Sequence, residues 1–295
     1  MTWTTRDISL SQCRRSAATL AFCTLSALAA LIPLQPAYAD ESPFASIYTT
    51  ELLPQGAVEI EQWLTWKHRK PDEQFDLLEG RTEIEYGFSN RFLGAFYLNY
   101  EHSKIEPKGP GAPDGPDDTT KFTGVNAEFI YQVLNPLTDP IGFGLYFEPS
   151  IGDDERALEF KLLFQKNFME DRLILAANLN LELEWEHDDV LDEWEPASAF
   201  EIYLGIAYQF APGWFGGVEF LNENGFEDHL KHAVDNAFYF GPTIHYGSQR
   251  WWATLGVFAQ LPWAGNPADD PAALSHGYLV GAERLRARLR IGVTL

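Results

Sequence analysis

Residues 173–189 read LILAANLNLELEWEHDD, a run in which leucine alternates with asparagine and glutamate. In a helix, residues two positions apart point about 200° away from each other, so these leucines would form no apolar face. In a strand they share one side, and the polar residues occupy the other side. The run therefore predicts a β-strand that separates an apolar environment from a wet, charged one.

The same alternation recurs along the chain. It predicts about twelve strands of roughly ten residues each, the length that crosses a bilayer when a strand is tilted. The expected strands lie within residues 58–66, 78–86, 92–101, 125–133, 141–149, 158–165, 173–186, 200–210, 218–221, 238–246, 253–261 and 285–295.

The connections between these strands are of two kinds, which alternate. Short turns such as GFSN at 87–90 and APGW at 211–214 are separated by longer polar stretches such as 187–196 and 222–235. The stretch IGDDE at 151–155 is short where a long loop is expected. This rhythm is typical of an all-β, transmembrane antiparallel up-and-down β-barrel with both termini on the short-turn side.

Aromatic residues gather at both ends of the expected strands, as two membrane interfaces would select. Those near the short turns are Trp214, Phe215, Trp251 and Trp252, and those near the long loops are Trp66, Tyr100, Trp185 and Trp263. A soluble β-sandwich or lipocalin-like barrel is the alternative. It is disfavoured because the polar faces carry too many carboxylates for a dry interior.

The first 39 residues have the pattern of a secretory signal peptide. Arg14 and Arg15 precede an apolar run, and AYA at 37–39 provides a cleavage site after Ala39. A transmembrane anchor is disfavoured because the apolar run is short for a bilayer and ends at prolines. A lipoprotein anchor at Cys23 is disfavoured because a bulky residue precedes this cysteine. The sequence thus predicts a signal peptide over 1–39 and a barrel domain over 40–295.

The expected mature chain is strongly acidic and has no thiol. Both cysteines, Cys13 and Cys23, lie in the signal peptide. The full chain has a formal charge of −22, and removal of three arginines and one aspartate with the signal peptide makes it about −24. Nucleic acid is therefore excluded as a partner by charge repulsion.

The C-terminal stretch RLRARLRIGVTL alternates apolar residues with four arginines. Terminal apolar alternation resembles the signal that delivers outer-membrane barrels to their insertion machinery, although that signal usually ends in Phe. Barrel closure would place the arginines beside Glu59 and Glu61 of the first strand, and cross-strand pairs of opposite charge are stabilising. The arginines are expected either to guide an anionic solute or to form a salt-bridged support of the wall.

The lumen is the candidate functional site, with the cationic strand facing an acidic wall. The residues expected to line the solute pathway are Glu59, Glu61, Glu83, Glu85, Glu182, Glu184, His245, Arg284, Arg286, Arg288 and Arg290.

Neither an enzyme site nor a metal site is expected. No nucleophile elbow is present, and His245 is the one histidine placed within a strand, where a hydrogen-bonded lumen role is expected. Acidic pairs in the loops lack the fixed spacing and glycine of a calcium loop, so solvated charge is the preferred interpretation. These pairs are Asp117–Asp118, Asp153–Asp154, Asp188–Asp189 and Asp269–Asp270. No cofactor is expected.

Two segments carry a family resemblance. YTTELLPQGAVEIEQWLTWK at 48–67 and EGRTEIEYGFSNRFLGAFYLNYEH at 79–102 resemble an uncharacterised family of Gram-negative outer-membrane barrels. That family is loosely related to a barrel family linked with the MetA pathway of phenol degradation. The resemblance implies an outer-membrane location and a barrel fold, and it implies no substrate and no catalytic residues.

Together these observations predict an outer-membrane barrel that acts as a passive channel or transporter for small solutes. The alternative is a non-conducting surface barrel whose acidic loops bind a partner or stabilise the lipopolysaccharide layer. A barrel enzyme ranks third. The expected partners are outer-membrane lipid, lipopolysaccharide, the barrel-insertion machinery and a small solute.

Overall fold

The computed structural model describes residues 42–70, 73–107, 117–188, 192–265 and 273–295. The predicted signal peptide lies outside these residues. Within them, no helix has the length and apolar character needed to cross a bilayer.

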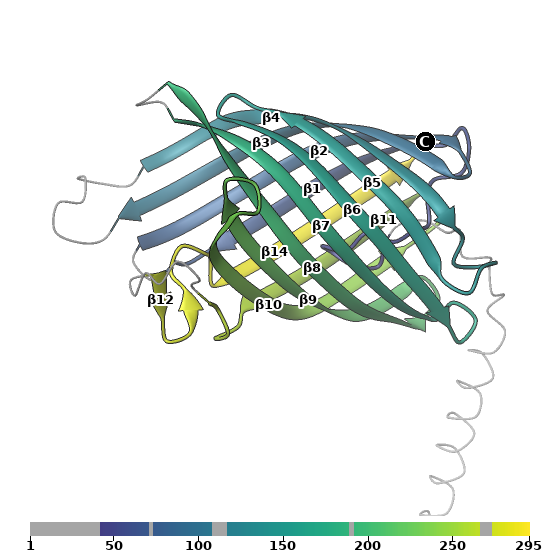
Figure 1. The fold of residues 1–295 in the computed structure, drawn as a ribbon. Helices are drawn as coiled ribbons and strands as arrows, with labels where there is room; N and C mark the ends of the chain where they lie inside the picture. Colours follow the sequence, from purple (N-terminus) through teal and green to yellow (C-terminus); the bar gives the residue numbers. More distant parts are fainter. Residues whose placement is uncertain (1–41, 71–72, 108–116, 189–191, 266–272) are drawn as a thin grey trace, which may run out of the picture. The chain divides into compact units, whose positions relative to one another are not determined.

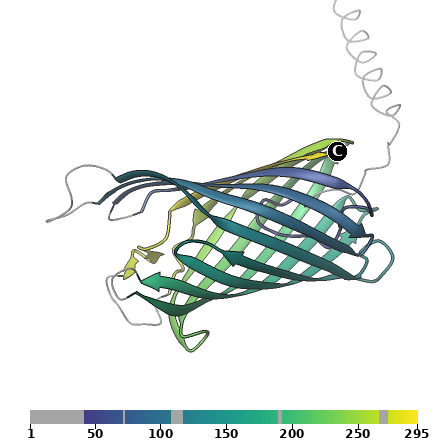
Figure 2. The same ribbon diagram turned by 90° about the horizontal axis from the view of Figure 1, so that it is seen from above.

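Twelve antiparallel strands form a closed barrel, as the sequence predicts (Figures 1 and 2). The barrel strands are β1 (Val58–His68), β2 (Glu73–Ser89), β3 (Phe92–Pro107), β4 (Asp117–Leu134), β5 (Gly142–Ile151), β6 (Glu155–Phe168), β7 (Leu173–Asp188), β8 (Glu193–Ala211), β9 (Trp214–Glu227), β10 (His232–Gly247), β11 (Trp251–Gln260) and β14 (Leu285–Thr294). The short strands β12 (Leu274–Ser275) and β13 (Tyr278–Leu279) form a separate hairpin in the connection between β11 and β14.

Strands adjacent in sequence pair around the ring, and β14 closes it against β1. The closing register runs from Glu59 opposite Thr294 to His68 opposite Leu285. Both strands of this closing pair are regular over their whole overlap, so no open sheet edge remains. Closure satisfies the backbone hydrogen bonds that a bilayer could not satisfy.

Side chains divide between the two faces as the alternation predicts. In β7, Asn178 and Asn180 are buried inside the barrel, while Leu179 and Leu181 alternate with them on the outer face. On the neighbouring strand, Ile206 points outward with 51% of its surface exposed. A wall of exposed apolar side chains around a closed barrel is the arrangement that a lipid environment stabilises.

Several strands are longer than the roughly ten residues expected. The barrel strands span 10 to 19 residues, and the longer ones arise because segments interpreted as long loops continue as paired strands. The stretch 222–235 is an example, since β9 extends to Glu227 and β10 begins at His232. Strands that project into water need no apolar face, so hydropathy alternation stops there while backbone pairing continues.

The aromatic belts are confirmed in part. Trp214 and Trp251 near the short turns point outward, with 40% and 46% of their surface exposed. The assignment of Trp252 and Phe215 to this belt is wrong, because Trp252 is buried and Phe215 packs against the interior apolar cluster. Each belongs to a dipeptide of two aromatic residues, and only one of two neighbours in a strand can face the lipid.

Candidate functional site

The lumen contains a segment that the sequence analysis did not foresee. Residues 42–57, here called the inner segment, precede β1 and run inside the barrel (Figures 1 and 2). Phe44, Ala45, Ile47 and Thr50 of this segment are completely buried. The segment pairs with no strand in the barrel sheet, so its buried backbone groups need other hydrogen-bond partners.

Lumen side chains provide these partners. Glu219 of β9 accepts hydrogen bonds from the backbone N–H groups of Ala45 and Ser46, at 2.6 and 2.9 Å. Asn178 of β7 accepts the N–H of Tyr48 at 2.8 Å and donates to the carbonyl of the same residue at 2.9 Å. Side-chain carboxylates and amides thus replace the neighbouring strand that the segment lacks.

Two glutamines hold the next part of the segment. The Oε1 of Gln165 in β6 accepts hydrogen bonds from the N–H and the hydroxyl of Thr50, at 2.8 and 3.0 Å. Gln132 of β4 donates to the carbonyl of Thr50 at 2.6 Å. These contacts fix the inner segment to β4, β6, β7 and β9, and Arg290 of β14 also donates to the carbonyl of Phe44 at 3.3 Å.

The barrel wall is shaped to receive the inner segment. A Cβ atom on Gly205 of β8 would lie 2.6 Å from Phe44 and 2.7 Å from Ile47. A Cβ atom on Gly256 of β11 would lie 2.6 Å from Ala45. Only glycine permits these close approaches. Glycines on the lumen face of otherwise apolar strands were the available sequence signal for the inner segment.

The four arginines lie on the interior face of β14 or at its entrance, but their partners differ from those predicted. In the closing register Arg290 lies opposite Trp63, and Glu59 lies opposite Thr294. One diagonal ion pair forms, between Arg290 and Glu61 at 3.4 Å. Closure thus sets the arginine strand beside the glutamates of β1, as expected, and the register places Arg290 two residues away from the position directly opposite Glu61.

Arg286 is held by carboxylates from outside β1. Its guanidinium contacts Glu223 of β9 at 2.6 and 3.0 Å and Glu283 at 2.6 Å. Burial of Glu283, which precedes β14, opposes its ionisation, but the neighbouring Arg286 outweighs this effect and lowers the pKa of the carboxyl. These contacts favour the interpretation of Arg286 as a support of the wall.

Arg288 and Arg284 have other surroundings. Arg288 donates to Thr65 at 2.9 Å and, within the described residues, has no carboxylate within ion-pair distance. Arg284 lies at the outer rim, where it stacks over the ring of Tyr278 in the β12–β13 hairpin at 3.6 Å. Of the four arginines, Arg288 is the one that lines the central cavity.

The central cavity has a volume of about 520 Å³ and reaches from the outer strand ends to Ser46 and Tyr48 of the inner segment. Its ionisable lining is strongly acidic. The acidic residues are Glu79, Glu101, Glu148, Asp153, Asp154, Glu155, Glu159, Glu182 and Glu201, and the basic residues are Arg81, Lys121, Lys161 and Arg288. Glu182 was predicted here, while Glu184 lies two residues further along the same interior face.

Three cations in this cavity, Arg81, Lys121 and Lys161, were not singled out from the sequence. Lys161 of β6 pairs with Glu159 at 2.9 Å and lies over the ring of Tyr48 at 4.5 Å. Arg81 of β2 lies 3.6 Å from Glu148. Inward-facing carboxylates surround each of these cations in its own strand or in a neighbouring strand. In the sequence, this alternation indicated a polar strand face but did not indicate an individual site.

The remaining predicted residues lie nearer the short turns. His245 is buried, its Nδ1 lies 2.7 Å from the hydroxyl of Thr254, and its ring stacks with Trp252. Glu59, Glu61, Glu83 and Glu85 are also buried, on β1 and β2. None of these five residues lines the central cavity.

Comparison with solved structures identifies the fold. The COG4313 outer membrane channel from Pseudomonas putida F1 is 12% identical, with a TM-score of 0.59, over 83% of this chain and 98% of that one. The NanC porin is 10% identical, with a TM-score of 0.51, over 81% and 100%. The chain therefore has the fold of an outer-membrane β-barrel.

The sequence comparisons name a family but no activity. No curated protein matches the chain. The predicted link to the MetA-pathway barrels stays a prediction, whereas the predicted uncharacterised family of barrels is confirmed in its broad form. A family model described as a family of unknown function, DUF6662, matches residues 36–295, so the chain belongs to the DUF6662 family.

Proposed function

We propose that this protein is a passive outer-membrane channel for small solutes, with a charged cavity on the outer side and the inner segment as its constriction. The observation that carries this proposal is the cavity of about 520 Å³ that ends at Ser46 and Tyr48. A funnel of this kind concentrates solutes by charge and limits them by size at its narrow end.

The charge of the cavity favours cationic or neutral solutes over anions. Nine acidic and four basic residues line it. Arg286 and Arg290, which an anion pathway would use, are each within ion-pair distance of a glutamate. The local potential is therefore negative, and it would raise the concentration of small cations in the cavity.

A non-conducting barrel is the second candidate, and the inner segment itself favours it. Most of the segment is buried, and it is hydrogen-bonded to β4, β6, β7, β9 and β14, as a permanent filling of the lumen would be. In this case the protein would act through its outer surface, for example by binding lipopolysaccharide or another envelope component.

Single-channel recording in planar bilayers tests the two candidates. A channel gives discrete conductance steps, and a salt gradient gives a reversal potential of the sign expected for cation preference. Glu182→Lys inside the cavity should shift that potential toward anions, whereas Glu193→Lys, the same change at an exposed strand end, should shift it less. A wild-type protein that inserts but shows no steps would support the second candidate.

The proposal includes a location and partners. An outer-membrane barrel fold and a surface of exposed apolar side chains support residence among outer-membrane lipids, with lipopolysaccharide beside the projecting strands. The apolar alternation of β14 supports recognition by the barrel-insertion machinery. Processing after Ala39 would release the chain for this route.

A further inference from the structure

Five glutamates form a buried group between the inner segment and the short-turn end of the barrel. They are Glu59 and Glu61 of β1, Glu83 and Glu85 of β2, and Glu128 of β4. Each is at most 6% exposed. We call this set the glutamate cluster. It lies outside the central cavity, and the proposed channel function does not use it.

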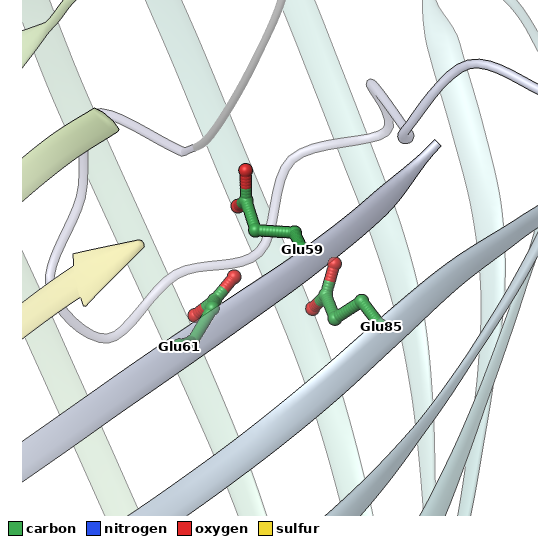
Figure 3. A group of neighbouring side chains, drawn as sticks. All are labelled: Glu59, Glu61 and Glu85. Carbon is green, nitrogen blue, oxygen red and sulfur yellow. The ribbon is translucent and has the colours of Figure 1, made fainter. Parts of the chain in front are cut away.

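The carboxylates converge on each other. One oxygen from each of Glu59, Glu61 and Glu85 lies within 4.8 Å of the other two, and Figure 3 shows these three side chains directed toward a common space. Oxygens of Glu83, Glu85 and Glu128 form a second trio with the same limit. Glu85 belongs to both trios, so the two groups are adjacent.

The cluster has too little positive charge around it. Within the described residues, Arg290 is the single cationic group in ion-pair distance, at 3.4 Å from Glu61. An ionised carboxylate that is buried without a counter-charge is strongly destabilising, even after the surroundings relax. Five carboxylates beside one guanidinium therefore need a further positive charge.

Hydrogen-bond donors satisfy only part of the cluster. Trp252 donates to Glu59 at 2.7 Å, Trp63 donates to Glu61 at 2.6 Å, and Tyr48 donates to Glu128 at 3.2 Å. Other oxygens are buried and have no hydrogen-bond partner among the described residues. These are Glu61 Oε1, Glu83 Oε2, Glu85 Oε2 and Glu128 Oε1. A ligand that accepts electron pairs from oxygen would satisfy all four.

Calcium fits both the spacing and the chemistry. Ca²⁺ prefers oxygen ligands at about 2.3–2.6 Å, so two oxygens on opposite sides of one ion lie roughly 4.8 Å apart. We propose that the glutamate cluster is a calcium-binding site, with Glu85 as the ligand shared by the two carboxylate trios. Bound calcium would join β1, β2 and β4 from inside the barrel, next to the closing strand pair.

Terbium luminescence provides a direct test. Tb³⁺ replaces Ca²⁺ in oxygen sites, and excited tryptophans a few ångströms away sensitise its emission. Trp63 and Trp252 are hydrogen-bonded to two of the glutamates. Folded, chelator-treated barrel in detergent should give tryptophan-sensitised Tb³⁺ emission that Ca²⁺ displaces.

Matched glutamine variants locate the site. Glu85→Gln should weaken Ca²⁺ binding at least about tenfold, because it removes a charged ligand from both trios. Glu184→Gln, the same change in the acidic outer part of the lumen, should leave affinity within about twofold. Glu85→Gln keeps the side-chain shape and removes buried charge, and retained heat-modifiable migration in gels verifies its fold. Glu128→Gln provides a second ligand variant.

Three results would overturn the proposal. Wild-type barrel that gives no Ca²⁺-displaceable emission would show that the carboxyls share protons instead of holding a metal. Unchanged affinity in both Glu85→Gln and Glu128→Gln would place the ion elsewhere. Tb³⁺-soaked crystals with anomalous peaks only on the outer strand ends would indicate adventitious surface binding, whereas a peak beside Glu85 supports the site.

Discussion

Asn178 of β7 forms a reciprocal pair of hydrogen bonds with the backbone of Tyr48, accepting its N–H at 2.8 Å and donating to its carbonyl at 2.9 Å. The amide side chain thus offers the inner segment the donor and acceptor that a neighbouring strand would otherwise present. This gives a structural role to Asn178, one of the two asparagines that alternate with leucine in residues 173–189.

Replacement of this amide should loosen the inner segment. Asn178→Ala leaves two buried backbone groups of Tyr48 without partners, which should reduce the local stability of the segment by about 2 kcal/mol. Hydrogen exchange at the Tyr48 amide should accelerate accordingly. Asn180→Ala is the matched control, since Asn180 faces the lumen two residues further and bonds to Glu201. Equal exchange rates in the two variants would argue against this role.

Replacement of Gly205, against which Phe44 and Ile47 pack, by a larger residue should displace the inner segment. Gly205→Val places new atoms against Phe44 and Ile47, and overpacking of this kind costs about 1–3 kcal/mol. Single-channel conductance should rise if the segment is the constriction. Gly216→Ala, whose added Cβ has only ordinary contacts with Phe210, should conduct as the wild type does. If the two variants had the same conductance, the inner segment would not be the constriction.

Arg286 should be essential for stability and not for selectivity. Arg286→Gln leaves Glu223 and Glu283 in the interior without their cationic partner. Breaking a buried ion pair costs about 3–5 kcal/mol. The midpoint of denaturant unfolding in lipid vesicles measures this loss, and Arg284→Gln at the rim serves as the control. A variant that unfolds like the wild type would contradict the structural role.

Acid should weaken the same contact. Because Arg286 lowers the pKa of Glu283, the stabilisation is present above the usual glutamate pKa of about 4.3. It is lost as the pH falls through the lower pKa of the folded protein. A Glu283→Gln variant should therefore lose less stability on acidification than the wild type, as measured by thermal unfolding across this pH range.

A charged residue on the outer face should destabilise the barrel more, the deeper it lies in the membrane. Ile206→Arg places a cation among exposed apolar side chains in the middle of β8 and should destabilise the inserted barrel by about 2–4 kcal/mol. Leu230→Arg, between β9 and β10 and also exposed, should have little effect. Unfolding of both variants from lipid vesicles gives the comparison, and equal losses would contradict a lipid-facing position for Ile206.

The strand faces were predictable because alternation with a period of two is a local property. Asn178 and Leu179 could be assigned to opposite faces from the sequence alone. The ion pairs were not predictable in this way. Arg290 lies opposite Trp63 because of the barrel register, which depends on the stagger of all twelve strands together.

The inner segment was not predictable for a different reason. Residues 42–57 carry no strand pattern, and their position depends on single side chains from strands far away in sequence. Glu219, for example, is separated from Ala45 by 174 residues. From the sequence alone, a glutamate that lines a solute pathway cannot be distinguished from one that accepts hydrogen bonds from an enclosed backbone segment.

The chain segment enclosed by the barrel directly precedes β1, and β1 pairs with the last strand to complete the ring. The ribosome delivers the enclosed residues first and the sealing strand last. Arg290 of β14 donates to the carbonyl of Phe44 at 3.3 Å, so the inner segment completes its contacts only when the last strand is in place. Filling of the lumen and closure of the ring are therefore coupled in the folded protein.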